Sequence, residues 1–269
     1  MFARTIICCC TIGLLATGCG GEDDSASTPT EPTSVPLAPL TVLVTNDDGI
    51  GAPGLDALVS VLKEMEAVEV VVVAPAENQS GTSDTTTVGA VVHRPGVTAS
   101  GVAGTAVEGY PADAVKVALD ELALVPDLVV SGVNEGQNVA NFAQVSGTVG
   151  AARTALRRGI PAVASSAGLG PLANFNAGAT LVAEWITAHR NELAKGTAQT
   201  ATVTSFNVPG CTLGTAKAVI EAPLAPVVPA NVNVFVTANC DLMPSTAPTN
   251  DVEALMGGYL VMTPVPAEL

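Results

Sequence analysis

Oxygen-bearing side chains follow three successive apolar runs of the sequence, each run typical of a buried β-strand. Asp47 and Asp48 follow the first run, within the segment NDDG. Ser80 comes shortly after the second run and Asn134 after the third. Because the carboxyl ends of parallel strands meet at one edge of a sheet, we expect these side chains to converge there. Two carboxylates, a hydroxyl and an amide oxygen favour Mg²⁺ or Mn²⁺ over Zn²⁺, and such an ion can polarise a phosphoryl oxygen.

A predicted helix over residues 146–158 begins close to the same edge. Ser146 is its expected N-cap, and Gly147 lets a ligand approach the backbone closely. The free N–H groups and the partial positive charge of a helix N-terminus suit an anion such as phosphate. The short gap between Asn138, after the third strand, and Ser146 keeps this helix start near the expected metal ligands. Taken alone, the same sequence also fits an ordinary helix cap.

Several other active-site classes fit these residues less well. Residues 49–54, GIGAPG, match the dinucleotide-binding pattern G-x-G-x-x-G, but the two carboxylates before this loop would repel a pyrophosphate unless a cation were bound. The sequence contains no Walker A motif and no G-x-S-x-G motif, which disfavours a P-loop protein and a serine esterase of that class. A haloacid-dehalogenase-type phosphatase needs a second acid two positions after the first, where this chain has Gly49.

Apolar runs and amphipathic helical segments alternate along the chain. Strands that are apolar on both faces and alternate with helices indicate a parallel sheet covered on both sides, so we expect an α/β fold. Residues 82–108, rich in Thr, Val and Gly, are expected to form β-structure outside the main sheet. Strands are predicted at 41–45, 68–74, 127–130, 162–165, 202–208 and 232–237, and helices from Pro53 and over 112–122, 146–158 and 177–194.

The composition is that of a folded, acidic protein. Hydrophobic residues make up 48% of the chain, which argues against disorder. Ten Lys and Arg residues against 25 Asp and Glu residues give a formal net charge of −15. This sign opposes the binding of phosphate backbones by charge alone, so no nucleic acid is expected as a stable partner. An acidic protein can still bind a phosphate where a bound cation reverses the local field.

The first 18 residues read as a lipoprotein-type signal peptide. One basic residue, Arg4, precedes an apolar run and then small residues; a buried helix is the alternative interpretation. With Cys19 lipidated, the pattern predicts an exported bacterial lipoprotein, bound to a membrane by its lipid anchor. It would face the periplasm or the cell surface, at the outer membrane in a Gram-negative cell. Residues 19–40, rich in Gly, Ser, Thr and Pro, are predicted to be a disordered tether, and residues 41–269 form the predicted domain.

Two further cysteines, Cys211 and Cys240, lie within the predicted domain. They form a disulfide or remain two buried free thiols, and their spacing does not distinguish these possibilities. Two lone cysteines make a poor zinc site.

Six ordered segments resemble the survival protein SurE family, from about residue 41 to residue 264. The resemblance implies a Rossmann-like three-layer α/β sandwich with a mostly parallel sheet, a β-rich excursion and a C-terminal extension. It also implies a homodimer or homotetramer that exchanges this extension, and metal-dependent 5′/3′-nucleotidase and acid phosphatase activity. The segments are TNDDGIGAPGLDAL, VVVVAPAENQSG, EGYPADAVKVAL, PDLVVSGVNEGQN, SGTVGAARTALRRGIPAVASS and NDVEALMGGYLVMTP.

The resemblance also assigns roles to individual residues. The two aspartates become catalytic residues and, with two neutral side chains, ligands of one divalent ion, Mg²⁺ or Mn²⁺: Asp47, Asp48, Ser80 and Asn134. Five further residues match positions that line the phosphate pocket of the family: Asn78, Asn138, Ser146, Gly147 and Thr148. Residues 141–145 depart from the family pattern, because the acids and the tyrosine that are usual in this segment are absent.

The predicted function is hydrolysis of nucleoside 5′- or 3′-monophosphates by a metal-dependent phosphomonoesterase. A broad-specificity acid phosphatase is the enzymatic alternative. A surface lipoprotein that binds a nucleotide or another anion without catalysis is the alternative from a different class. Typical members of the family are cytosolic, so the lipoprotein-like leader is a second departure from the family pattern.

Overall fold

The computed structural model describes residues 36–169 and 174–268, and Leu37–Leu269 form one compact unit. The predicted leader and all but the last five residues of the predicted tether lie outside the described residues. Within the described ranges, no helix combines the length and the apolar character that crossing a membrane requires.

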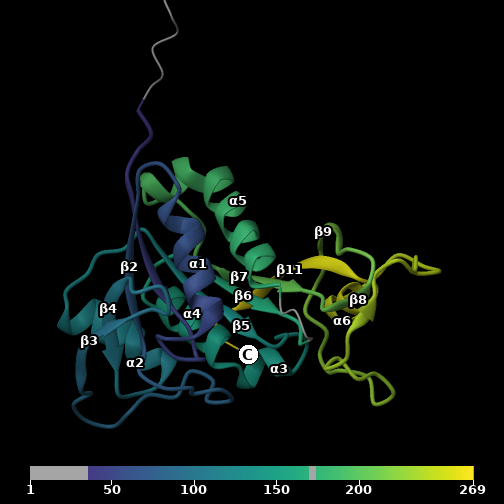
Figure 1. Cartoon of the computed structure of the whole chain (residues 1–269), viewed down its shortest axis with the longest axis horizontal. Helices are drawn as coiled ribbons and strands as arrows, with labels where there is room; N and C mark the ends of the chain where they lie inside the picture. Colours follow the sequence, from purple (N-terminus) through teal and green to yellow (C-terminus); the bar gives the residue numbers. More distant parts are fainter. Residues whose placement is uncertain (1–35, 170–173, 269) are drawn as a thin grey trace, which may run out of the picture. The chain divides into compact units, whose positions relative to one another are not determined.

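A nine-stranded sheet forms the centre of this unit (Figure 1). Its strands are β1 Leu40–Thr45, β2 Val68–Pro75, β3 His93–Val97, β4 Ala103–Val107, β5 Leu128–Glu135, β6 Ala162–Ala167, β7 Thr202–Val208, β9 Lys217–Glu221 and β11 Tyr259–Pro266. The order across the sheet is β3-β4-β2-β1-β5-β6-β7-β11-β9. The six strands from β4 to β7 are parallel, whereas β3 and β11 run antiparallel to β4 and β7. The sheet is therefore mostly parallel, as predicted.

Helices cover both faces of the sheet. They are α1 Pro53–Lys63, α2 Pro111–Lys116 with the π-helical turn η1 Val117–Glu121, α3 Phe142–Val145, α4 Gly147–Arg157, α5 Phe175–Ala194 and α6 Asp251–Met256. Helices α1 and α5 share an apolar cluster with one face of the sheet, and α2 and α4 share a second cluster with the other face. These three layers confirm the predicted α/β sandwich (Figure 1).

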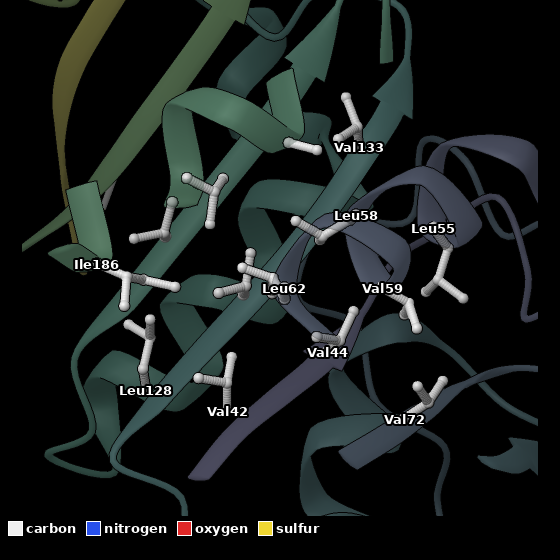
Figure 2. Close-up of a cluster of buried hydrophobic side chains, with 14 of the residues drawn as sticks. Val42, Val44, Leu55, Leu58, Val59, Leu62, Val72, Leu128, Val133 and Ile186 are labelled. Carbon is white, nitrogen blue, oxygen red and sulfur yellow. The ribbon is translucent and has the colours of Figure 1, made fainter. Parts of the chain in front are cut away.

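The position of β1 between two layers of helices explains why its sequence is mostly apolar. Val42 and Val44 point to the cluster that contains Leu58 of α1, as Figure 2 shows. Leu43 between them points to the other cluster, which contains Val149 of α4. Since successive side chains of a strand point to opposite faces, a strand between two helix layers has no polar face. All five side chains are inaccessible to solvent.

Two predictions about β-structure need correction. Residues 82–108 do contain two strands, but β4 pairs in parallel with β2, through Val73 and Thr105, and so extends the main sheet. The predicted strand at 232–237 is wrong, because this segment consists of turns and irregular structure. There the side-chain oxygen of Asn233 accepts a 3.0 Å hydrogen bond from the N–H of Phe235, which makes a local turn instead of a sheet ladder.

A small second sheet lies in the C-terminal part of the chain. Strands β8 Cys211–Leu213 and β10 Ala238–Asn239 pair in parallel. A disulfide joins Cys211 to Cys240, with a Cα–Cα distance of 5.6 Å. Of the two arrangements that the sequence left open, the structure contains the disulfide.

Candidate metal and phosphate site

The site lies where the order of the parallel strands reverses. The chain passes from β1 to β2 on one side, while β5 flanks β1 on the other side. In open α/β sheets, ligands bind at the carboxyl ends of the strands at such a point. Asp47 and Asp48 follow β1 after Asn46, and Asn134 lies near the end of β5. The pairing of β5 with β6 is irregular between Ser131 and Asn134, so the strand changes its course just before this asparagine.

A pocket of about 190 Å³ opens at this edge of the sheet. Five of the predicted site residues line it: Asp47, Ser80, Asn134, Asn138 and Ser146. They come from four separate segments of the chain, which the fold brings together at this edge of the sheet.

The remaining predicted residues lie around this pocket. Asp48 and Asn78 line a neighbouring pocket of about 360 Å³, and Glu135 borders both pockets. Gly147 and Thr148 line neither of the two, because they lie against the buried side chain of Asp47.

Asp47 is held by the first turn of α4. Its carboxylate accepts a 2.6 Å hydrogen bond from the hydroxyl of Thr148. A Cβ atom at Gly147 would lie 2.8 Å from the Cβ of Asp47, so only glycine lets the helix approach this closely. Burial raises the pKa of Asp47, and the Thr148 hydroxyl acts in the opposite direction by stabilising the carboxylate. Thr148 therefore supports Asp47 and does not itself form the pocket wall.

Asp48 is held from two sides. Its two carboxylate oxygens accept hydrogen bonds from the side-chain amide of Asn78, at 3.1 Å, and from the N–H of Glu135, at 3.0 Å. Burial, followed by the negative charge of Asp47, raises the pKa of Asp48 to about 6. A cation between the two carboxylates would oppose both effects, because it favours the ionised form of each.

The donor chemistry of the site fits a hard divalent cation. The amide nitrogen of Asn134 donates a 2.6 Å hydrogen bond to the carbonyl of Gly136, which leaves its oxygen for a ligand. In the described part of the chain, neither that oxygen nor the hydroxyl of Ser80 takes part in a hydrogen bond. The same ranges contain no group of three or more His, Cys, Asp or Glu side chains suited to a metal. A bound ion would therefore have two carboxylates and neutral oxygens as protein ligands, a set that suits Mg²⁺ or Mn²⁺.

The charge of the site gives an independent reason for a cation. As far as the structure describes the chain, the residues that line the two pockets include Asp47, Asp48, Glu77 and Glu135 and no Lys, Arg or His. A phosphate group would meet a negative field there unless a metal ion reversed it.

Asn138 is held in place by two residues that were not predicted from the sequence. Its backbone N–H donates a 2.7 Å hydrogen bond to the side chain of Asn207 on β7. Its side-chain amide donates to the hydroxyl of Ser166 on β6, at 2.9 Å. All three side chains are buried. Polar residues near the carboxyl ends of apolar strands were the signal that could have revealed this pair.

The helix start next to the pocket has the predicted cap. The hydroxyl of Ser146 accepts a 3.1 Å hydrogen bond from the N–H of Val149. The remaining N–H groups of the first turn of α4 are those that a helix cannot satisfy internally. Ser146 itself lines the pocket, so the positive end of this helix lies at the pocket wall.

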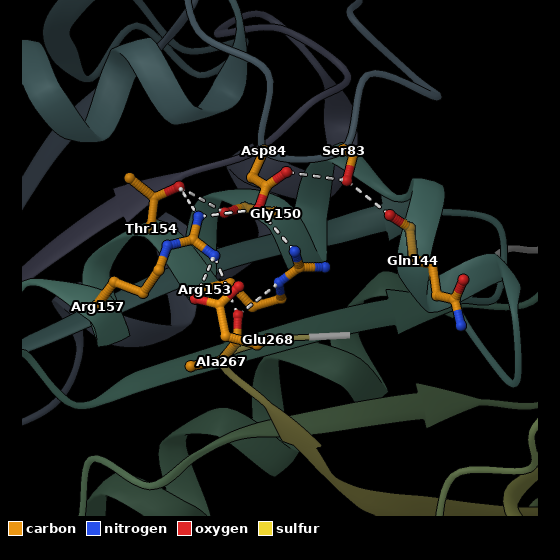
Figure 3. A network of polar contacts seen from close by, with 9 residues as sticks. All are labelled: Ser83, Asp84, Gln144, Gly150, Arg153, Thr154, Arg157, Ala267 and Glu268. Carbon is orange, nitrogen blue, oxygen red and sulfur yellow. Dashed lines mark hydrogen bonds and ion pairs between the residues drawn. The ribbon is translucent and has the colours of Figure 1, made fainter.

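An ion-pair network holds down the loop that follows Ser80 (Figure 3). The carboxylate of Asp84 accepts hydrogen bonds from Arg153, at 2.6 Å, and from Arg157, at 2.9 Å. Both arginines belong to α4. Burial alone would raise the pKa of Asp84, but the two guanidinium groups outweigh it and hold the pKa below its usual value of 3.8.

A close backbone contact adds to this network. The carbonyl oxygen of Ser83 lies against Gly150 of α4, where a Cβ atom would be only 2.1 Å from it. The hydroxyl of Ser83 donates a 2.6 Å hydrogen bond to the carbonyl of Gln144. The loop from Ser80 to Asp84 is thus fixed on the same helix that orients Asp47.

The chain was compared with known protein families and curated proteins. The model of the family described as "Survival protein SurE" matches residues 42–226. "5′-nucleotidase SurE 1" of Burkholderia lata is 48% identical over 128 residues, which cover 46% of this chain and 48% of that protein. "5′-nucleotidase SurE" of Carboxydothermus hydrogenoformans is 46% identical over 136 residues, covering 48% and 50% of the two chains. The matched part thus spans about half the length of these curated relatives.

These relatives correct the predicted location. They carry the name 5′-nucleotidase SurE, and the resemblance implied that typical proteins of this kind are cytosolic. The prediction of an exported lipoprotein at the periplasm or the cell surface is therefore wrong. An apolar run after a single basic residue also fits other N-terminal segments, so this pattern was a weak guide. The residues on which it rested, 1–18 and Cys19, lie outside the described residues.

A solved structure supports the same relationship over most of the chain. The crystal structure of the SurE protein from Aquifex aeolicus superposes with a TM-score of 0.67 at 25% sequence identity. The match covers 85% of this chain and 94% of that one. With the family model matched over residues 42–226, the chain belongs to the survival protein SurE family.

Proposed function

We propose that this chain hydrolyses nucleoside 5′- or 3′-monophosphates to nucleoside and phosphate, with one divalent ion, Mg²⁺ or Mn²⁺. The observation that carries this proposal is a single pocket lined by Asp47, Ser80 and Asn134, with Ser146 at the start of α4 in its wall. The names of the relatives support the same activity. In this proposal residues 41–269 are the phosphatase domain.

The metal ligands, the start of α4 and Thr148 each have a role in this mechanism. The ligands of the ion would be Asp47, Asp48, Ser80 and Asn134. When bound, the ion supplies positive charge that polarises the phosphoryl oxygens. The free N–H groups at the start of α4 bind phosphate oxygens beside it and stabilise the charge that develops during transfer. Thr148 keeps the Asp47 carboxylate in one orientation through its hydrogen bond.

Phosphate release by the full chain tests the activity. The substrates are 5′- and 3′-mononucleotides and p-nitrophenyl phosphate, each with Mn²⁺, with Mg²⁺ and with EDTA. We expect metal-dependent release from the nucleotides, and its loss in the Asp47→Asn variant. Equal rates on p-nitrophenyl phosphate and on nucleotides would favour the broad-specificity acid phosphatase. An active, folded Asp47→Asn variant would overturn the ligand assignment.

A thermal shift gives a second readout that does not need turnover. Mn²⁺ should raise the melting temperature of the wild-type chain by mass action, and EDTA should reverse the shift. The Asp47→Asn variant should melt at a similar temperature without metal and should lack this shift. A shift without phosphate release would favour the non-catalytic binding protein.

We also propose that the chain assembles into a homodimer or homotetramer. Large apolar side chains are exposed on the C-terminal part of the chain, among them Leu213, Val227, Leu242 and Met243. Such side chains are typical of surfaces that a partner covers. Light scattering after size exclusion should give a mass above the 26.8 kDa of one chain. A monomer at high protein concentration would contradict this part of the proposal.

A further inference from the structure

The pocket has a polar floor and an apolar rim. Four buried polar residues form the floor, whereas Phe142, Val145 and Phe235 line the rim; the floor residues are Asp47, Asn134, Asn138 and Ser146. Val145 is 52% exposed and Phe235 is 45% exposed, so this apolar surface faces solvent beside the pocket. A bare phosphate group has no apolar surface that such a rim could contact.

Phe142 and Phe235 form an aromatic pair. Their ring centroids are 4.7 Å apart and their planes are inclined by 80°, which is an edge-to-face arrangement. Phe142 lies in α3, whereas Phe235 comes from the segment before β10, more than 90 residues later in the chain. In an edge-to-face pair the two rings leave faces that a third aromatic ring can cover.

Polar contacts hold the two segments of this pair together. The side-chain amide of Gln137 donates a hydrogen bond to the carbonyl of Val234. The side-chain oxygen of Asn141 accepts a 3.0 Å hydrogen bond from the N–H of Val228. Val234 is only 3% exposed and belongs to a third apolar cluster. The backbone that leads to the exposed Phe235 ring is therefore anchored up to the residue before it.

Asp251 adds a further connection between these segments. Its carboxylate accepts 2.8 Å hydrogen bonds from the N–H of Ala140 and from the N–H of Ala225. Asp251 is fully buried. The loop before Phe142 and the segment that leads to Phe235 thus bind the same carboxylate, which fixes the rim before any substrate arrives.

We propose that Phe142 and Phe235 form the stacking surface for the aromatic base of the substrate. The inference rests on the proposed nucleotidase function and names its specificity-determining residues. With phosphate on the polar floor, the nucleoside part of the substrate extends toward the rim, where an aromatic ring gains stacking with either base type. The site accordingly prefers phosphomonoesters whose leaving group carries an aromatic ring.

Steady-state kinetics of the full chain test this proposal. AMP and UMP carry a base, whereas ribose 5-phosphate presents the same sugar and phosphate without one. In the Phe235→Leu variant we expect the KM for AMP to rise about tenfold, as removal of one stacking partner predicts, with little change in kcat. The KM for ribose 5-phosphate should stay within about twofold of wild type. Phe142→Leu should act in the same direction.

Val236→Ala provides the matched control. Val236 is the neighbouring residue, is 48% exposed and does not line this pocket, so its truncation reports loosening of the segment alone. Equal changes for AMP and ribose 5-phosphate in Phe235→Leu, or no change for either, would overturn the stacking surface. The same changes in Val236→Ala would also overturn it.

Binding separates failure of this proposal from failure of the proposed function. If the wild-type chain releases no phosphate from any substrate, the nucleotidase proposal fails, and calorimetry with AMP and ribose 5-phosphate in the presence of Mn²⁺ decides the stacking. Tighter binding of AMP that Phe235→Leu abolishes supports the stacking surface. Equal affinity for both compounds, or no binding of either, rejects it.

Discussion

The hydroxyl of Thr148 donates a 2.6 Å hydrogen bond to the carboxylate of Asp47, although 101 positions separate the two residues in the sequence. Both groups are buried. The start of α4 therefore contributes to the proposed site in two ways: Ser146 lies in the pocket wall, and the Thr148 side chain orients the proposed metal ligand. The position of this helix and the geometry of the ligand are coupled.

Replacing Thr148 by Val tests this coupling. Valine keeps the shape but leaves the buried Asp47 oxygen without its partner, which should lower the free energy of unfolding by about 1–2 kcal/mol. We expect weaker Mn²⁺ binding by calorimetry and a kcat reduced about tenfold, because the carboxylate loses its fixed orientation. Thr148→Ser keeps the hydroxyl and should retain most of both. A Thr148→Val variant with wild-type metal affinity would show that this bond does not position the ligand.

Replacing Gly150 by Ala should displace the loop that carries Ser80. The added Cβ would lie 2.1 Å from the carbonyl oxygen of Ser83, so the loop or the helix must move. We expect the free energy of unfolding to fall by about 1–3 kcal/mol and Mn²⁺ affinity to fall with it. Gly51→Ala is the control for stability, since no atom lies within 4 Å of a Cβ there. Unchanged metal affinity in a destabilised Gly150→Ala variant would mean that Ser80 is not a ligand.

The ion pairs of Asp84 predict a pH dependence of stability. The arginines lower the pKa of Asp84 in the folded state below its unfolded value of 3.8. The stabilisation is therefore complete above this value and is lost as the pH falls through the lowered folded-state pKa. At about pH 7, Asp84→Asn should lower the free energy of unfolding by about 2 kcal/mol, and this difference should shrink toward about pH 2.5. Urea unfolding of both proteins at the two pH values measures it; a constant difference would contradict the ionic origin.

Asp251 should be essential for the rim of the pocket. Its two carboxylate oxygens accept hydrogen bonds from Ala140 and Ala225, whereas the amide of an asparagine offers one acceptor and sets its NH₂ group against a backbone donor. Asp251→Asn should therefore lower the free energy of unfolding by about 2–3 kcal/mol. In the folded variant the KM for AMP should rise more than that for ribose 5-phosphate. Thermal unfolding and kinetics with the two substrates check these effects.

The sequence predicted the parallel strands β1, β2, β5, β6 and β7, because most of them are short apolar runs between two helix layers, whereas β4 was expected outside the main sheet. It did not predict β11, which alternates between buried and exposed residues and contains Pro264 and Pro266. Proline removes a backbone donor and usually argues against a strand, but β9 pairs with β11 only over residues 259–262. One side of β11 is therefore an unpaired edge at the two prolines, where this loss is tolerated. The opposite error occurred in the Val-rich segment 232–237, which was predicted to be a strand and is not one. Its alternating valines have the period of a strand, but Asn233 forms a turn.

In the candidate site too, some features could be predicted from the sequence and others could not. Motifs with local meaning, such as the adjacent acids Asp47 and Asp48 and the N-cap Ser146, could be recognised from the sequence. Contacts that join distant segments could not, since no pattern in a single sequence connects Asp84 to Arg153 or Phe142 to Phe235. These long-range pairs arise only once the strands have fixed the ends of their loops.

Two stretches of the chain form the rim of the pocket, and the family model matches only one of them. The family model matches residues 42–226, which include all four proposed metal ligands and Phe142, whereas Phe235 and Asp251 lie beyond that range. Under the roles proposed above, the hydrolytic step and the recognition of an aromatic leaving group belong largely to different stretches of one chain. The tail can then change toward another class of leaving group while the residues of the hydrolytic step are preserved, which is a simple route for a duplicated gene to acquire a new substrate.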